Sequence, residues 1–88
     1  MVDIQAIYRR GVIEFGEAQA DRYHDDLEST FEMLATFVGA GQALPNVHPP
    51  TRIYPKAAHV VVYRHSRDHV EILRIFHQSE DWIDKLRI

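Results

Sequence analysis

The chain has 88 residues and a mass of 10.3 kDa, which is the size of one small domain and leaves no room for a second. Apolar residues make up 45% of it, enough for a small core and too many for a disordered segment. The formal net charge of −3 argues against a protein that binds nucleic acid mainly through the phosphate backbone. Cysteine is absent, which excludes disulfides and thiolate zinc sites and is typical of the cytoplasm.

The first part of the sequence predicts two helices, roughly over residues 3–15 and 17–37. Apolar residues recur there at spacings of three and four, which is the pattern of an amphipathic helix. Asp3 is a suitable N-cap for the first helix, and Gly16 can supply the left-handed residue that ends it. We therefore expect an antiparallel helix hairpin whose second helix buries one stripe: Ala20, Tyr23, Leu27, Phe31 or Thr30, and Leu34.

Regular structure must break between residues 39 and 55, which contain all four prolines and two of the four glycines. Beyond the break, β-branched residues at a period of two predict strands over 59–64 and 70–76, joined by a polar turn. A short strand over 51–54 can precede them, stopped by Pro55 at a sheet edge.

Residues 79–86 read as a short C-terminal helix with Ser79 as its N-cap. Helices followed by strands indicate an α+β fold, a helix hairpin packed on a small antiparallel sheet of about three strands. We expect residues 1–88 to form a single domain, and no run approaches the roughly 18 apolar residues that a membrane span needs.

Metal and cofactor sites have little support. His65 and His69 have the spacing of a metal pair, but they lie on the predicted turn with no cluster of further ligands around them. The four glycines match no phosphate-binding fingerprint. We expect neither a metal nor a cofactor.

Polar side chains on the otherwise apolar strands attract more interest. By strand parity Arg74 shares a face with Val70, Ile72 and Phe76, whereas His77 lies on the opposite face. Arg74 can contact a partner molecule, or it can pair internally with Asp81 or Glu71 and brace the C-terminal helix.

An ordered set of segments resembles the ParE branch of the ParE/RelE toxins. The set comprises residues 16–23 and 27–35, Arg52, residues 59–64, and residues 70–77 with Asp81 and Trp82. The resemblance implies a non-enzymatic toxin from a bacterial toxin–antitoxin operon that acts on DNA gyrase in the cytoplasm. It also implies a ParD-type antitoxin, a ribbon–helix–helix protein that alone contacts operator DNA. Two alternatives stay open: a RelE-like ribosome-dependent mRNA endonuclease, and a degenerate toxin that acts only as an operon co-regulator.

For such a toxin we expect two groups of functional residues. The candidates for target contact and toxicity lie toward the C-terminus: Arg64, Arg74, His77, Asp81 and Trp82. The candidates for antitoxin contact lie on the second helix: Glu17, Asp21, Tyr23 and Glu28. The three acidic side chains among them suit Lys or Arg on the partner.

Three departures from the family pattern carry expectations of their own. ParE-like chains usually open with a β-strand before the first helix, whereas this sequence begins within the region that resembles that helix. We therefore expect one sheet edge to be missing or to be supplied by another chain. The usual glycine before the His59 strand is replaced within Lys56-Ala57-Ala58, and Glu80 stands where an apolar residue is common.

Overall fold

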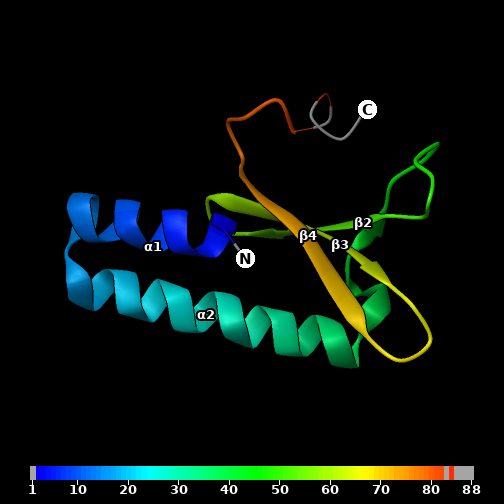
Figure 1. The fold of residues 1–88 in the computed structure, drawn as a ribbon, viewed down its shortest axis with the longest axis horizontal. Helices are drawn as coiled ribbons and strands as arrows, with labels where there is room; N and C mark the ends of the chain where they lie inside the picture. Colours follow the sequence, from blue (N-terminus) through cyan, green and yellow to red (C-terminus); the bar gives the residue numbers. More distant parts are fainter. Residues whose placement is uncertain (1, 83, 85–88) are drawn as a thin grey trace.

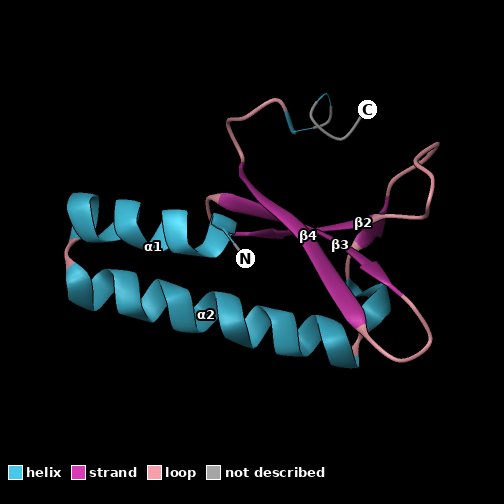
Figure 2. Ribbon diagram, in the orientation of Figure 1, coloured by secondary structure: helices cyan, strands magenta, loops and turns pink. Residues whose placement is uncertain are grey.

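The computed structural model describes residues 2–82 and 84, and in these residues two helices precede a four-stranded sheet (Figures 1 and 2). This order confirms the α+β class. The elements are α1 (Val2–Phe15), α2 (Glu17–Thr36), the 3₁₀ turn η1 (Val38–Ala40), β1 (Gln42–Ala43), β2 (Arg52–Lys56), β3 (His59–His65) and β4 (Val70–His77). None of the helices in the described part of the chain is long and apolar enough to cross a membrane.

The two helices form the predicted hairpin, which extends beyond the sheet in Figure 1. Gly16 joins them with φ 88° and ψ 163°, a backbone conformation that is essentially restricted to glycine. The expected conformation was the left-handed helical one, whereas the observed ψ is that of an extended chain. The second helix buries its predicted stripe, because Ala20, Leu27, Thr30 and Leu34 are all buried.

The first helix is covered only in part. None of its described side chains is fully buried, and Ile13 near the hairpin tip is 85% exposed. Its apolar stripe therefore packs along α2 and leaves surface open toward the sheet.

The sheet is antiparallel throughout, with the strand order β1-β2-β3-β4. β1, a two-residue strand that pairs with Arg52 and Ile53, is the strand that the sequence did not predict. Pro55 does not stop β2 but lies within it, opposite Val60. Since β1 does not extend to Pro55, the missing N–H of the proline falls on an open edge, where proline is tolerated.

The core lies between α2 and one face of the sheet, where Leu34 packs against Val61 and Tyr63. The buried Tyr63 hydroxyl accepts a hydrogen bond from the Gly41 N–H (2.9 Å) and donates one to the Val38 carbonyl (2.7 Å). These bonds attach the segment that follows α2 to β3. The Tyr63 hydroxyl therefore has both a donor and an acceptor partner inside the core.

A β-bulge changes the predicted faces of β4. Val62 pairs with Arg74, but the next residue of β3, Tyr63, pairs with Ile72, so one extra residue is inserted into β4. Val70 and Ile72 consequently pack toward α2 with Tyr63, whereas Arg74 and Phe76 lie on the other face. The prediction that these four residues share one face is therefore wrong, although Arg74 and His77 do lie on opposite faces.

Two predicted caps are also wrong. Asp3 lies one residue inside α1, and its carboxylate contacts β4 instead of capping the helix. Ser79 lies three residues before Trp82, the first helical residue of the C-terminal segment, and its hydroxyl contacts His77. Within the predicted helix over 79–86, residues 83, 85 and 86 lie outside the described residues, and of the others Trp82 and Asp84 are helical whereas residues 79–81 are not.

Candidate functional site

Arg74 is fixed at the edge of the sheet by the first turn of α1. Its Nε donates to Asp3 Oδ2 over 2.7 Å, and the same carboxylate oxygen accepts the backbone N–H of Ile75 over 3.0 Å. The guanidinium also stacks over the Phe76 ring, 5.0 Å from its centroid. The hydrogen bond to Asp3, and next its negative charge, raise the pKa of Arg74 above its ordinary value. The expected internal pairing with Asp81 or Glu71 is thus replaced by a pairing with Asp3.

His77 belongs to a different cluster, centred on His59 of the neighbouring strand. The two rings meet edge to face with centroids 5.4 Å apart. The Tyr23 hydroxyl lies 3.2 Å from the Lys56 carbonyl and 2.6 Å from His59 Nδ1, within hydrogen-bond distance of both. His77 Nδ1 accepts the backbone N–H of Ser79 (3.1 Å).

The surroundings favour the neutral forms of His59 and Tyr23. Burial, and next the charge of His77, lower the pKa of His59, against an opposing effect of Glu80. Burial, followed by the charge of Asp26, raises the pKa of Tyr23. A neutral imidazole and a neutral phenol can accept and donate hydrogen bonds to a partner without the cost of burying a charge.

A groove of about 740 Å³ connects the two clusters. It runs between the helix hairpin, the β2–β3 turn and the C-terminal half of β4. Its walls include Ile4, Ile7 and Leu27 on the helices and Ile75, His59 and His77 on the sheet. A partly apolar groove with a few convergent polar groups is the usual form of a binding surface in a small domain.

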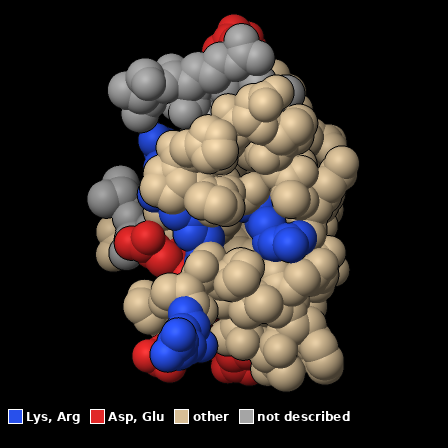
Figure 3. Space-filling view, turned by 90° about the vertical axis from the view of Figure 1, so that its right-hand side faces the viewer, with Lys and Arg blue, Asp and Glu red and all other residues tan. Residues whose placement is uncertain are grey.

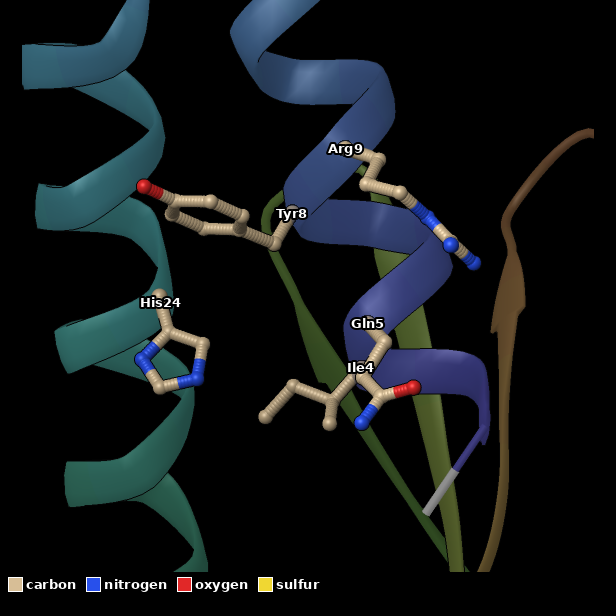
Figure 4. Close-up of a pocket in the computed structure, with 5 residues that line it drawn as sticks. All are labelled: Ile4, Gln5, Tyr8, Arg9 and His24. Atoms are coloured by element: carbon tan, nitrogen blue, oxygen red, sulfur yellow. The ribbon is translucent and has the colours of Figure 1, made fainter.

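A second, smaller hollow of about 430 Å³ lies on the hairpin itself. Figure 4 shows Tyr8 reaching from α1 toward α2 beside His24, while Arg9 points away. The Tyr8 hydroxyl donates to Asp21 over 2.6 Å, and this bond is the main reason that the pKa of Tyr8 rises to about 12. The tyrosine therefore holds the two helices together.

The four antitoxin candidates separate into two groups. Glu17, Asp21 and Glu28 follow one another at spacings of four and seven along one exposed stripe of α2. Glu28 Oε1 lies 3.6 Å from Nε2 of His24, and His24 belongs to the same stripe. Tyr23 projects from another side of the helix and enters the groove, where it meets His59.

The five target candidates do not form one cluster either. Arg64 is half-buried on the face of Arg74 and donates from Nε to Thr51 Oγ1 over 3.3 Å. Asp81 is exposed and Trp82 is half-buried, both beyond the end of β4. Figure 3 shows the sheet end of the molecule as a mostly uncharged surface with a few basic side chains, and with acidic side chains along its left side and lower rim.

Sequence reasoning missed His59 and Asp3 as parts of the site. The sequence pattern indicates His59 only as a strand residue, and the register that places it opposite His77 depends on the β3–β4 turn and on the bulge in β4. Asp3 is 71 positions from Arg74 in the sequence, and no local pattern joins them.

The fold and these surfaces define a class of small α+β domain with a groove between a helix hairpin and the last strand of an antiparallel sheet. The sequence matches the family described as "ParE toxin of type II toxin-antitoxin system, parDE" over residues 2–82. It is 36% identical over 77 residues to "Toxin ParE1" of Caulobacter vibrioides, a match that covers 88% of this chain and 79% of that protein. The chain therefore belongs to the ParE family of toxins from type II toxin–antitoxin systems.

A solved structure agrees with this assignment at the level of the fold. The chain is similar to one described as "Chromosomal ParDE TA system from P. aeruginosa", with a TM-score of 0.72. The match has 23% sequence identity and covers 86% of this chain and 84% of that chain. The predicted helix hairpin and antiparallel sheet thus have a counterpart in a ParDE system.

Proposed function

We propose that this ParE-type toxin acts in the bacterial cytoplasm by inhibiting DNA gyrase, without chemistry of its own, and thereby arrests DNA replication. The observation that carries the proposal is the match to the ParE family over residues 2–82. The placement of Arg74 and His77 supports it, because the two side chains lie on opposite faces of β4 and belong to separate clusters, Arg74 with Asp3 and His77 with His59. Separated anchors suit a contact surface better than acid–base catalysis.

The arrangement of the C-terminal surface supports a binding role in a second way. The Arg74 side chain is paired with Asp3 through Nε and is 55% exposed, so its planar guanidinium remains accessible to a carboxylate or phosphate. Asp81 and Trp82 would extend this contact beyond the end of β4, and Arg64, which pairs with Glu71 near the start of that strand, would extend it along the face of Arg74. A tryptophan and an arginine are the residue types that most often dominate interface energetics.

The proposed partner that neutralises the toxin is a ParD-type antitoxin, a ribbon–helix–helix protein through which the pair would contact operator DNA. The similarity to a ParDE system supports this partner. The groove offers an amphipathic segment an apolar surface, and the acidic stripe of Glu17, Asp21 and Glu28 beside it suits Lys or Arg on the same segment.

Induction of the chain in growing bacteria tests the proposal. We expect growth to stop, plasmid DNA to lose negative supercoils or appear linearised, and messenger RNA to stay intact. Co-expression of the antitoxin gene should restore growth. Codon-specific cuts in messenger RNA with unchanged supercoiling would instead identify a RelE-like endonuclease. Unimpaired growth, together with tighter operator binding by the antitoxin, would identify an operon co-regulator.

A further inference from the structure

Two histidines face each other on the side of the sheet that forms the groove. His59 and His77 are partners in the β3–β4 register, and their rings meet edge to face with centroids 5.4 Å apart. Both line the groove, as does Tyr23 from α2. The Tyr23 hydroxyl lies 2.6 Å from His59 Nδ1, so the pair is joined to the helix hairpin. Because β3 is paired with β2 on one side and with β4 on the other, His59 is fixed inside the sheet.

A proton on either ring changes the contacts of the pair. His77 Nδ1 accepts the backbone N–H of Ser79 (3.1 Å), so the proton of the neutral ring lies on Nε2. A second proton at Nδ1 makes this atom a donor, and the Ser79 N–H loses its acceptor. The Ser79 hydroxyl, 2.7 Å from Nδ1, can then accept from the ring instead. A proton on His59 places a cation in a half-buried position beside His77, where each charge opposes the other.

The charged groups around His59 act in both directions. Burial, and next the charge of His77, lower the pKa of His59, whereas Glu80 acts against them. Lys56, the register partner of His59 on β2, carries a further positive charge. The other charged and titratable groups of the groove and its rim are Asp3, Arg10, Glu14, His24, Asp26 and Arg74. Acidic surroundings therefore do not outweigh burial and like charge at His59.

We propose that the His59–His77 pair makes the affinity of this toxin for its antitoxin depend on pH, an inference that rests on the proposed function. While both rings are neutral, an amphipathic segment can cover them without burying a charge. After protonation the segment would cover one or two cations, and its own Lys or Arg would lie near them. Acid therefore weakens the complex, and by linkage the bound antitoxin opposes protonation of the pair.

Titration of the toxin with the antitoxin encoded by the adjacent gene, at pH 7.5 and pH 5.5, tests this inference. We expect the parent to bind about fivefold or more weakly at pH 5.5, the loss that follows when binding lowers one histidine pKa by about one pH unit. The double variant His59→Asn with His77→Asn should lose most of this pH dependence. His65→Asn, at the exposed end of β3, is the matched control and should behave like the parent. Melting curves at both pH values verify that each chain is folded.

NMR titration of the two rings adds a measurement that needs no variant. We expect the midpoints of His59 and His77 to lie about one pH unit lower in the complex than in the free toxin. Equal midpoints, or a pH dependence of affinity that persists in the folded double variant, would overturn the inference and leave the proposed function standing. Loss of the pH dependence in His24→Asn alone would assign it to the His24–Glu28 pair and overturn the inference as well. Failure of the antitoxin to bind at pH 7.5 would overturn the proposed neutralisation itself.

Discussion

At the scale of single residues, His59 makes the stability of the fold depend on pH. It is half-buried beneath Tyr23 and faces His77, while Glu80 acts on it from the turn after β4. Its neutral form is favoured in the folded state, so the folded chain binds fewer protons here than the unfolded chain does. By linkage, the free energy of unfolding is highest above the ordinary histidine pKa of about 6.5 and falls as the pH drops below it.

This coupling predicts the behaviour of His59→Asn, whose side-chain amide can still donate to Tyr23. The parent should lose stability between pH 7 and pH 5, and the variant should lose less over the same range. Urea unfolding at several pH values measures both curves. His48→Asn, in the exposed loop before β2, is the matched control and should follow the parent. Parallel curves for parent and His59→Asn would show that other groups cause the pH dependence.

Gly41, which follows η1, lies where the fold leaves no room for a side chain. A Cβ on Gly41 would collide with the Tyr63 hydroxyl and lie 2.6 Å from the Ile53 carbonyl oxygen, whereas one on Gly39 would meet nothing within 4 Å. Gly41→Ala should therefore lower the free energy of unfolding by about 1–3 kcal/mol through overpacking. Gly39→Ala should change it by less than about 0.5 kcal/mol. Equal melting temperatures for the two variants would refute the close packing around Tyr63.

At the scale of elements, the β2–β3 turn contains Ala57 and Ala58, which lie where ParE-like chains usually have a glycine before the His59 strand. Ala57 has φ 52°, a left-handed conformation that is costly for any residue with a Cβ. A positive φ at the first of two turn residues favours glycine in that place.

Ala57→Gly should accordingly stabilise the fold by about 0.5–1 kcal/mol, the strain relieved being partly offset by the greater freedom of glycine in the unfolded chain. Ala58→Gly, next to it and without a positive φ, should stabilise nothing. Thermal unfolding of the two variants gives the comparison. A gain from Ala58→Gly equal to that from Ala57→Gly would contradict the assigned turn geometry.

Periodicity predicted the regular elements because each depends on residues close in sequence. The spacing of Ala20, Leu27 and Leu34 fixes the buried side of α2 without reference to any other element. The bulge in β4 and the contact of Asp3 with Arg74 depend instead on how separate elements meet. For this reason the sequence predicted Arg74 as a notable residue and assigned it the wrong neighbours.

At the scale of the whole molecule, the unequal charge distribution bears on the antitoxin. The helix α2 holds six acids and a single base, Arg22. Glu17→Lys with Glu28→Lys reverses two charges of its exposed stripe and leaves the Tyr8–Asp21 bond in place. We expect antitoxin affinity to fall by about tenfold or more at low salt and its salt dependence to weaken.

Adding Asp21→Lys should reduce the affinity further. The control is Asp68→Lys in the exposed β3–β4 turn, which should bind like the parent. Titrations at two salt concentrations give the affinities. Binding that is independent of salt and survives all three reversals would contradict an electrostatic role for this stripe.

We propose that gyrase binds the surface around the end of β4. The most direct test is gyrase supercoiling of relaxed plasmid in the presence of purified toxin, compared among four chains of verified melting temperature. The parent should inhibit supercoiling, and Arg74→Ala and His77→Ala should each inhibit at least about tenfold less, as expected when a dominant interface residue is truncated. Arg67→Ala, an exposed arginine of the β3–β4 turn, should inhibit like the parent. Full inhibition by folded Arg74→Ala and His77→Ala, or none by the parent, would contradict the account.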